Sequence, residues 1–151
     1  ATEMMELIAH LKEKYYVDSE KIYSTGFSMG GRESLFIGFT HPDRFGYVGA
    51  ACPAPGLTPL ADSPAHPGQM AEDAMRFDEP HLLLITASKA DGVVGRFPAS
   101  YHEMLERTET AHFWHVLENT GHDPSSVKPH LYHFFRRIFG KSPETPDRSE
   151  H

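Results

Sequence analysis

Ser28 lies between glycines in a pattern that can turn a serine hydroxyl into a nucleophile. Residues 26–30 read Gly-Phe-Ser-Met-Gly, a G-x-S-x-G sequence, with a strand-like run before them (21–25) and a helix-like stretch after them (32–39). A turn this tight strains the serine backbone and admits only small residues two positions before and after it. The helix N-terminus also favours an oxyanion. The context predicts an esterase-type nucleophile; a glycine-rich turn with an idle serine is the alternative.

A serine nucleophile needs a base and an acid that orients the base. In α/β-hydrolases these residues follow the serine in the order acid, then histidine. An apolar strand over 81–87 runs into the loop that carries Asp91, and a strand over 112–117 runs into the loop that carries His122. All three side chains would lie beyond the carboxyl ends of strands, where open parallel sheets bind ligands. We therefore predict Asp91 as the acid, His122 as the base and the backbone N–H of Met29 as an oxyanion donor.

Other acids and histidines fit less well. Asp123 is too near His122 in sequence to reach its ring, and three further aspartates lie in a Pro-rich loop or a weak helix (Asp62, Asp73, Asp78). His112 and His115 point to opposite faces of one strand and cannot share a metal. His130 and His133 lie one helical turn apart, but no carboxylate or cysteine joins them at ligand spacing, which favours an ordinary helix face. The remaining histidines look like surface or strand-edge residues (His10, His41, His66, His81, His102, His151). We expect no metal and no cofactor.

The elements that must position these residues alternate between helix and strand. Residues 3–15 place Met4, Ile8, Leu11 and Tyr15 on one stripe, which predicts an amphipathic helix. The other predicted elements are strands at 21–27, 46–52, 81–87 and 112–117, and helices at 29–40, 95–108 and 124–139. This alternation predicts an α/β fold: a parallel sheet with right-handed crossovers and helices on both faces.

Two segments depart from that alternation. Residues 53–80 contain six prolines and one modest helical patch at 69–77. A segment of that length leaving a strand end is typical of a lid or substrate loop, although a plain surface excursion is the alternative. Residues 141–151 are polar and hold no core residue, so we expect a tail or linker stub there and one domain over 1–140.

Composition restricts the partners. The chain has 151 residues, 39% of them hydrophobic, which is enough for one core. A net charge of −7 argues against nucleic acid and anionic membranes as partners. No stretch approaches the roughly 18 apolar residues of a spanning helix. The single cysteine, Cys52, is expected to be a small buried strand residue; it excludes an internal disulfide but does not indicate a compartment.

From about Tyr15 to Phe139 the chain resembles the carbohydrate-esterase family of bacterial feruloyl esterase domains, more distantly related to acetyl xylan esterases and esterase D. The matching pieces are Gly-Phe-Ser-Met-Gly-Gly (26–31), the run over 37–49, Ser-Lys-Ala-Asp-Gly-Val-Val-Gly (88–95) and Gly-His-Asp (121–123) with Lys-Pro behind it (128–129). The resemblance implies an α/β-hydrolase in which Ser28, Asp91 and His122 are nucleophile, acid and base. It implies cleavage of feruloyl or acetyl esters on plant cell-wall polysaccharide, and it suggests secretion. Val127 stands where such enzymes tend to carry a tryptophan.

The order of the predicted elements also bears on completeness. An initial helix leads straight to the nucleophile strand, so no earlier strand supplies the loop with the second oxyanion N–H. We expect this to be the C-terminal part of a hydrolase domain, with the N-terminal strands contributed by a missing or separate segment. The predicted function is a serine esterase that acts through an acyl-enzyme. The alternatives are a peptidase or acyltransferase on the same fold, or an inactive hydrolase-like binding module.

Overall fold

Four parallel strands form the sheet of the computed structural model, which describes residues 2–59, 68–75 and 82–140. Along the sheet they follow chain order: β1 (Tyr23–Phe27), β2 (Tyr47–Ala51), β3 (Leu82–Ser88) and β4 (Phe113–Leu117). Phe27 pairs with Ala51, and Ala51 pairs with Thr86. The carboxyl ends of neighbouring strands therefore meet at one edge of the sheet, where the loops with the candidate site residues begin.

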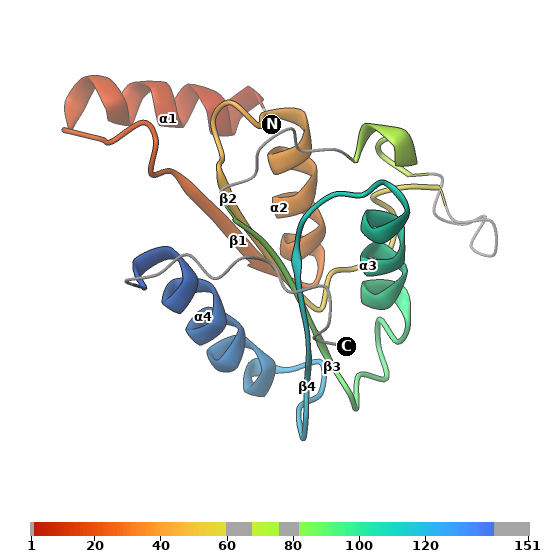
Figure 1. Ribbon diagram of the computed structural model, residues 1–151. Helices are drawn as coiled ribbons and strands as arrows, with labels where there is room; N and C mark the ends of the chain where they lie inside the picture. Colours follow the sequence, from red (N-terminus) through yellow and green to blue (C-terminus); the bar gives the residue numbers. More distant parts are fainter. Residues whose placement is uncertain (1, 60–67, 76–81, 141–151) are drawn as a thin grey trace.

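Helices cover both faces of this sheet. Figure 1 shows α2 (Met29–Thr40) and α3 (Phe97–Arg107) on one face and α4 (Pro124–Phe139) on the other. The larger core cluster lies on the α2/α3 face and includes Leu35, Val48, Ile85, Tyr101 and Leu105. The smaller one lies under α4 and joins Leu82 and Leu84 to Phe134. The predicted α/β architecture with helices on both faces is confirmed.

The predicted element boundaries are close to the observed ones. The helices predicted over 29–40 and 124–139 have those bounds, and the helix predicted over 95–108 covers Phe97–Arg107. β3 is buried along its whole length, as its continuous apolar run predicts for a central parallel strand. Pro124 at the first position of α4, after the cap residue Asp123, explains why that helix begins where it does.

The first helix forms where it was predicted, but little of its apolar side is buried. α1 covers Thr2–Lys14, but most of the predicted apolar stripe is exposed: Met4 by 45%, Leu11 by 37% and Tyr15 by 58%. Only Ile8 of that stripe, joined by Met5, packs against the core cluster. The amphipathic pattern predicted the helix correctly, but most of its apolar stripe is not buried, because α1 lies across one end of the sheet rather than flat on a face (Figure 1).

The segment after β2 is described at residues 52–59 and 68–75. It begins beside the nucleophile turn, where the Ala54 N–H donates to the Ser28 carbonyl at 3.0 Å. It then packs against α3: the Tyr101 hydroxyl donates to the Ala54 carbonyl at 2.7 Å, and Met75 is fully buried in the core cluster. Of the helical patch predicted over 69–77, the described part forms only a short 3-10 helix, η1 (Glu72–Ala74). The remainder of the predicted substrate loop, and the tail over 141–151, lie outside the described residues.

Candidate functional site

The turn between β1 and α2 holds Ser28 in an unusual backbone conformation. Its φ is +56° and its ψ is −117°, a region that residues with side chains rarely occupy. Backbone hydrogen bonds fix it there: the Ser28 N–H donates to the Ala51 carbonyl at 2.9 Å, and the Arg32 N–H donates to the Ser28 carbonyl at 3.1 Å. Strain of this kind costs on the order of 1–3 kcal/mol and persists only where the surroundings enforce it. Here the end of β2 and the first turn of α2 enforce it.

The two flanking glycines do not contribute equally. A Cβ added at Gly26 would collide with the backbone carbonyl of Gly30, whereas a Cβ added at Gly30 would meet nothing within 4 Å. Gly31 is tight instead, because its Cβ would come within 3.2 Å of the Ala51 carbonyl oxygen. The expectation that both flanking positions exclude bulk therefore holds for Gly26 but is wrong for Gly30. The second steric restriction lies one residue later, where α2 crosses the end of β2.

The side chains of the three predicted residues form one hydrogen-bonded chain. His122 Nε2 lies 2.9 Å from Ser28 Oγ, and His122 Nδ1 lies 2.8 Å from Asp91 Oδ2. The tautomer that satisfies both contacts carries its proton on Nδ1, donates it to the carboxylate and leaves Nε2 to accept the serine proton. These residues come from three different loops at the same edge of the sheet. The geometry is that of a nucleophile, a base and an orienting acid.

Asp91 is held from both of its carboxylate oxygens. Oδ1 accepts the backbone N–H groups of Val93 at 2.8 Å and Val94 at 2.9 Å, while Oδ2 faces His122. Burial raises the pKa of the Asp91 carboxyl, but the hydrogen bonds from His122, Val94 and Val93 outweigh it and bring that pKa below its ordinary value. The side chain is only 2% exposed. The carboxylate is thus charged, shielded from water and fixed in orientation.

Two neighbours that sequence reasoning did not assign to the site shape its walls. The Phe27 ring packs on the His122 imidazole with 4.6 Å between ring centroids, and it also contacts the small apolar cluster of Cys52, Ala54 and Val94. The G-x-S-x-G pattern contains Phe27 as an unspecified position, so only its place next to the serine could have indicated this role. Cys52 is fully buried one residue after β2, and burial raises the pKa of its thiol. It is a buried residue, as predicted.

Among the described acids, the alternatives to Asp91 lie elsewhere. Asp123 is the N-cap of α4, where its Oδ1 accepts the Ser125 N–H at 2.7 Å. Asp73 belongs to η1, and the other two candidates, Asp62 and Asp78, lie outside the described residues.

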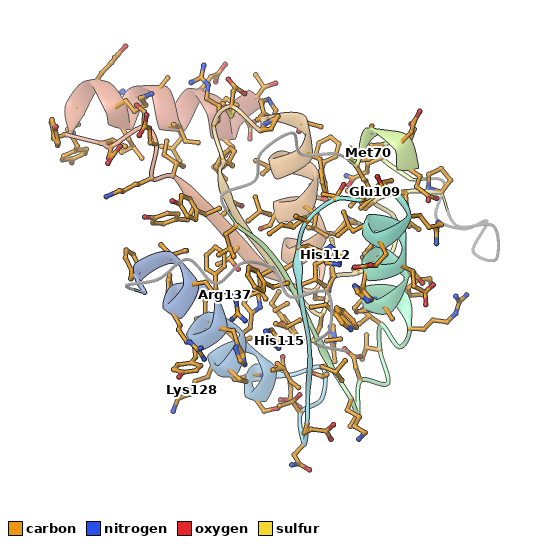
Figure 2. All side chains as sticks on the ribbon, viewed as in Figure 1. Met70, Glu109, His112, His115, Lys128 and Arg137 are labelled. Atoms are coloured by element: carbon orange, nitrogen blue, oxygen red, sulfur yellow. The ribbon has the colours of Figure 1, made fainter. Side chains whose placement is uncertain are left out.

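The two histidine pairs have different surroundings. His112 contacts His102 of α3, whereas His115 contacts Arg137 of α4, so they lie on opposite sides of the sheet, as Figure 2 also shows. His130 is buried and bonded to threonines, while His133 stacks on His115 at 4.5 Å. His130 and His133 therefore do not form a chelating pair, as predicted, and His130 lies on the buried face of the helix.

Met29 is the first residue of α2, directly after Ser28. The first N–H groups of a helix have no partner within that helix. The Met29 N–H is therefore available to an oxyanion formed at Ser28, while its side chain is 63% exposed. In the described part of the chain no strand precedes β1, so the loop that carries the second donor in α/β-hydrolases has no counterpart there.

Comparisons with solved structures agree with the fold described above. The structure resembles the CE1 ferulic acid esterase AmCE1/Fae1A of the anaerobic fungus Anaeromyces mucronatus without substrate, with a TM-score of 0.81 and 39% identity over 87% of this chain and 50% of that one. The same esterase in complex with ferulic acid gives a TM-score of 0.78 and 39% identity, over 85% and 49%. The S-formylglutathione hydrolase FrmB of Staphylococcus aureus shares the fold at 14% identity, with a TM-score of 0.64 over 86% and 56%.

The chain spans about half the length of the fungal esterase that it matches. That esterase is fungal, so the comparison supports the predicted esterase family and says nothing of a bacterial origin.

In the described part of the chain, no helix is long and apolar enough to cross a membrane. The model of the Esterase family, described as "Putative esterase", matches residues 4–122, a range that contains Ser28, Asp91 and His122. The chain belongs to this esterase family.

Proposed function

We propose that this chain carries the nucleophile, base and acid of a serine esterase that removes feruloyl or acetyl groups from plant cell-wall polysaccharide. The observation that carries the proposal is the hydrogen-bonded chain from Ser28 Oγ through His122 to Asp91. The likeness to a ferulic acid esterase at 39% identity supports the substrate class. The strained turn at Ser28 supports the nucleophile role, because such strain is typical of functional sites.

The reaction proceeds in two displacements. Ser28 Oγ attacks the ester carbonyl carbon while His122 Nε2 takes the hydroxyl proton, and the Met29 N–H holds the resulting oxyanion. The ester C–O bond then breaks, His122 returns the proton to the sugar oxygen, and the acyl group stays on Ser28. Water attacks this acyl-enzyme with the same proton transfers, which releases the carboxylic acid and restores the serine.

Asp91 has two tasks in this scheme. Its hydrogen bond to His122 Nδ1 keeps the tautomer that can accept a proton at Nε2, and its charge stabilises the imidazolium that forms during each displacement. The two backbone N–H groups on Oδ1 keep the carboxylate from turning away. No step requires a cofactor.

A fluorophosphonate probe tests the nucleophile directly. The probe should form a covalent adduct that peptide mapping by mass spectrometry assigns to Ser28, and neither Ser28→Ala nor His122→Ala should be labelled. Ser24→Ala is the matched control, since Ser24 lies in the adjoining strand and bonds to Ser34 rather than to His122. A folded wild-type chain that is not labelled, even when the N-terminal strands of the domain are supplied by co-expression, would support a binding module instead.

Substrate turnover then separates the enzyme classes. We expect hydrolysis of methyl ferulate and release of acetate from acetylated xylan, with no cleavage of peptide anilides and no preferred transfer of the acyl group to added alcohols. Cleavage of the anilides, or acyl transfer that exceeds hydrolysis, would replace the esterase by a peptidase or an acyltransferase.

A further inference from the structure

A second group of potential ligand atoms lies away from Ser28, at the opposite end of β4 from the His122 loop. His112 immediately precedes β4, and His102 and Glu106 lie one helical turn apart on α3. His102 Nδ1 is 2.7 Å from His112 Nε2, and Glu106 Oε1 is 3.7 Å from the same Nε2. The three ligand atoms all lie within 4.8 Å of one another. Figure 2 shows His112 on the α3 side of the sheet.

The His112 ring is oriented in the way that metal-binding histidines are. Its Nδ1 lies 2.7 Å from the Thr110 carbonyl oxygen, so Nδ1 carries the proton and Nε2 accepts the hydrogen bond from His102 Nδ1. To ligate a metal through Nδ1, His102 would carry its ring proton on Nε2 instead. In metal sites the ligating histidine usually donates its other N–H to a carbonyl or carboxylate in this manner. The His112 side chain is only 2% exposed, so the surrounding protein and the Thr110 carbonyl hold its ring in this orientation.

We propose that His102 Nδ1, His112 Nε2 and the Glu106 carboxylate bind a divalent transition-metal ion, for which Zn²⁺ is the best match. Two imidazoles, one carboxylate and a water molecule are a common tetrahedral set for zinc. Glu106 is 46% exposed on its side chain, so the fourth position faces solvent. The two ring nitrogens must open from 2.7 Å to about 3.3 Å, the spacing that a tetrahedron with Zn–N bonds of 2.0–2.1 Å requires.

The surroundings allow that small opening. The His102 ring stacks on Trp114 with 4.9 Å between centroids and 3° between planes, so it can slide within its plane without losing the contact. The Glu106 side chain, partly in solvent, can close the remaining distance. Bound metal would join α3 to the start of β4 across the turn at 108–111 and would stabilise the folded chain. It would serve stability, because the ligands lie at the other end of β4 from the His122 loop.

The amino-acid sequence alone does not indicate these ligands and favours no metal. By sequence His102 looks like a surface residue, and His112 can be compared only with His115 on the same strand. Glu106 and His112 are separated by the end of a helix and a turn, so no fixed ligand spacing connects them. The three residues meet only because α3 packs beside β4.

Isothermal titration of the full chain with Zn²⁺ tests the proposal. A His122→Ala background should be used throughout, because His122, Asp91 and Cys52 are a separate group of nearby ligand atoms. We expect one ion bound per chain, and an affinity at least about 100-fold weaker in His102→Ala, since changes even to the partners of ligands cost 10–100-fold. Glu106→Gln should weaken binding as well. His10→Ala, an exposed histidine on α1, is the matched control and should bind like its parent.

Two further readouts keep the test independent of folding defects. Zn²⁺ should raise the melting temperature of the parent and of His10→Ala but not of His102→Ala, and Co²⁺ should give the visible absorption bands of a tetrahedral ion only when His102 and His112 are present. His112 is buried and its substitution can unfold the chain, so His102 and Glu106 carry the decision. A parent that binds no Zn²⁺, or a His102→Ala variant that binds it unchanged, would show that His102 and His112 form only a hydrogen-bonded pair.

Discussion

His122 and His130 lie on one stretch of chain, and each uses both ring nitrogens, but their partners differ in charge. His122 bridges Ser28 Oγ at 2.9 Å and Asp91 Oδ2 at 2.8 Å. His130, on the buried face of α4, bridges Thr25 Oγ1 of β1 and Thr86 Oγ1 of β3, both at 2.8 Å. The first histidine has a carboxylate on one side, whereas the second has a neutral hydroxyl on each side.

That difference decides what each ring can do. In the proposed reaction the Asp91 carboxylate stabilises the imidazolium that forms when His122 takes the serine proton. His130 is 1% exposed, and burial, with the charge of His133, lowers its pKa to about 4. It stays neutral at physiological pH and joins α4 to two strands of the sheet. A buried histidine with two hydrogen bonds is therefore a candidate base only where one partner is charged.

The glycine between these strands makes the His130 bridge possible. Gly49 on β2 pairs with Thr25, and a Cβ at Gly49 would come within 2.7 Å of Thr25 Oγ1 and 2.9 Å of the Phe134 ring. A side chain there would push apart the groups that hold α4 against the sheet. The hydrogen bonds of His130 to Thr25 and Thr86 therefore depend on residue 49 having no side chain.

Removing the negative charge of Asp91, the partner of His122, should have the largest effect of the changes considered, and the effect should be on catalysis. In Asp91→Asn the amide can keep the Val93 and Val94 contacts, but it turns an N–H towards His122 and favours the tautomer with its proton on Nε2. We expect kcat/KM for a feruloyl ester to fall by roughly 10²–10⁴-fold. Circular dichroism should show that the fold is retained. Full activity in Asp91→Asn would mean that Asp91 is not the acid that orients His122.

The next largest effect concerns the pH dependence of stability through His130. An unfolded histidine binds a proton near pH 6.5, whereas folded His130 does so only near pH 4, so the folded state loses stability as the pH falls from 6.5 to 4. A shift of this size corresponds to about 3 kcal/mol, fully available above pH 6.5. Urea denaturation at several pH values measures it. The loss of unfolding free energy between pH 6.5 and pH 4 should be smaller by about 3 kcal/mol in His130→Gln than in the parent. In His10→Gln it should equal the parent's loss. If the unfolding free energy depends on pH equally in the parent and in His130→Gln, then His130 does not stay neutral as proposed, and it does not differ from His122 in this respect.

The three residues of the candidate site show what could be predicted from the sequence alone. The proximity of Ser28, Asp91 and His122 could be predicted because each stands at a strand end marked by its own neighbours, and parallel strands bring such ends together. Their proximity in the structure needed no long-range information beyond the order of strands. The substrate loop could not be tested in the same way, since its central residues lie outside the described part of the chain.

α4 shows why the rest could not be predicted. Its buried residues are Ser126, His130 and Phe134, two of them polar, while Phe135 and Phe139 on the same helix are exposed by 43% and 68%. The apolar stripe of α4 runs along Val127, Leu131, Phe135 and Ile138, and hydrophobic periodicity therefore centres the buried face part of a turn away from Ser126 and His130. His130 can be buried because its ring forms hydrogen bonds with the hydroxyls of Thr25 on β1 and Thr86 on β3. The residues next to His130 in the sequence give no indication of these partners. The His102 and His112 contact was hidden for the same reason.

The smallest effect should come from the hydroxyls beside His130. Thr86→Val keeps the side-chain shape but leaves His130 Nδ1 without its partner in a fully buried position, which should destabilise the protein by about 1–3 kcal/mol. Thr25→Val, on the partly buried side of the bridge, should cost less. Both variants should keep kcat/KM close to the parent value at temperatures where they remain folded, because neither threonine contacts Ser28, Asp91 or His122 in the described hydrogen bonds. Chemical denaturation and ester hydrolysis, measured on the same samples, check the two statements together. A loss of activity in Thr86→Val as large as that in Asp91→Asn, with the fold retained, would mean that His130 contributes to the reaction and that the two histidines are not separate in function.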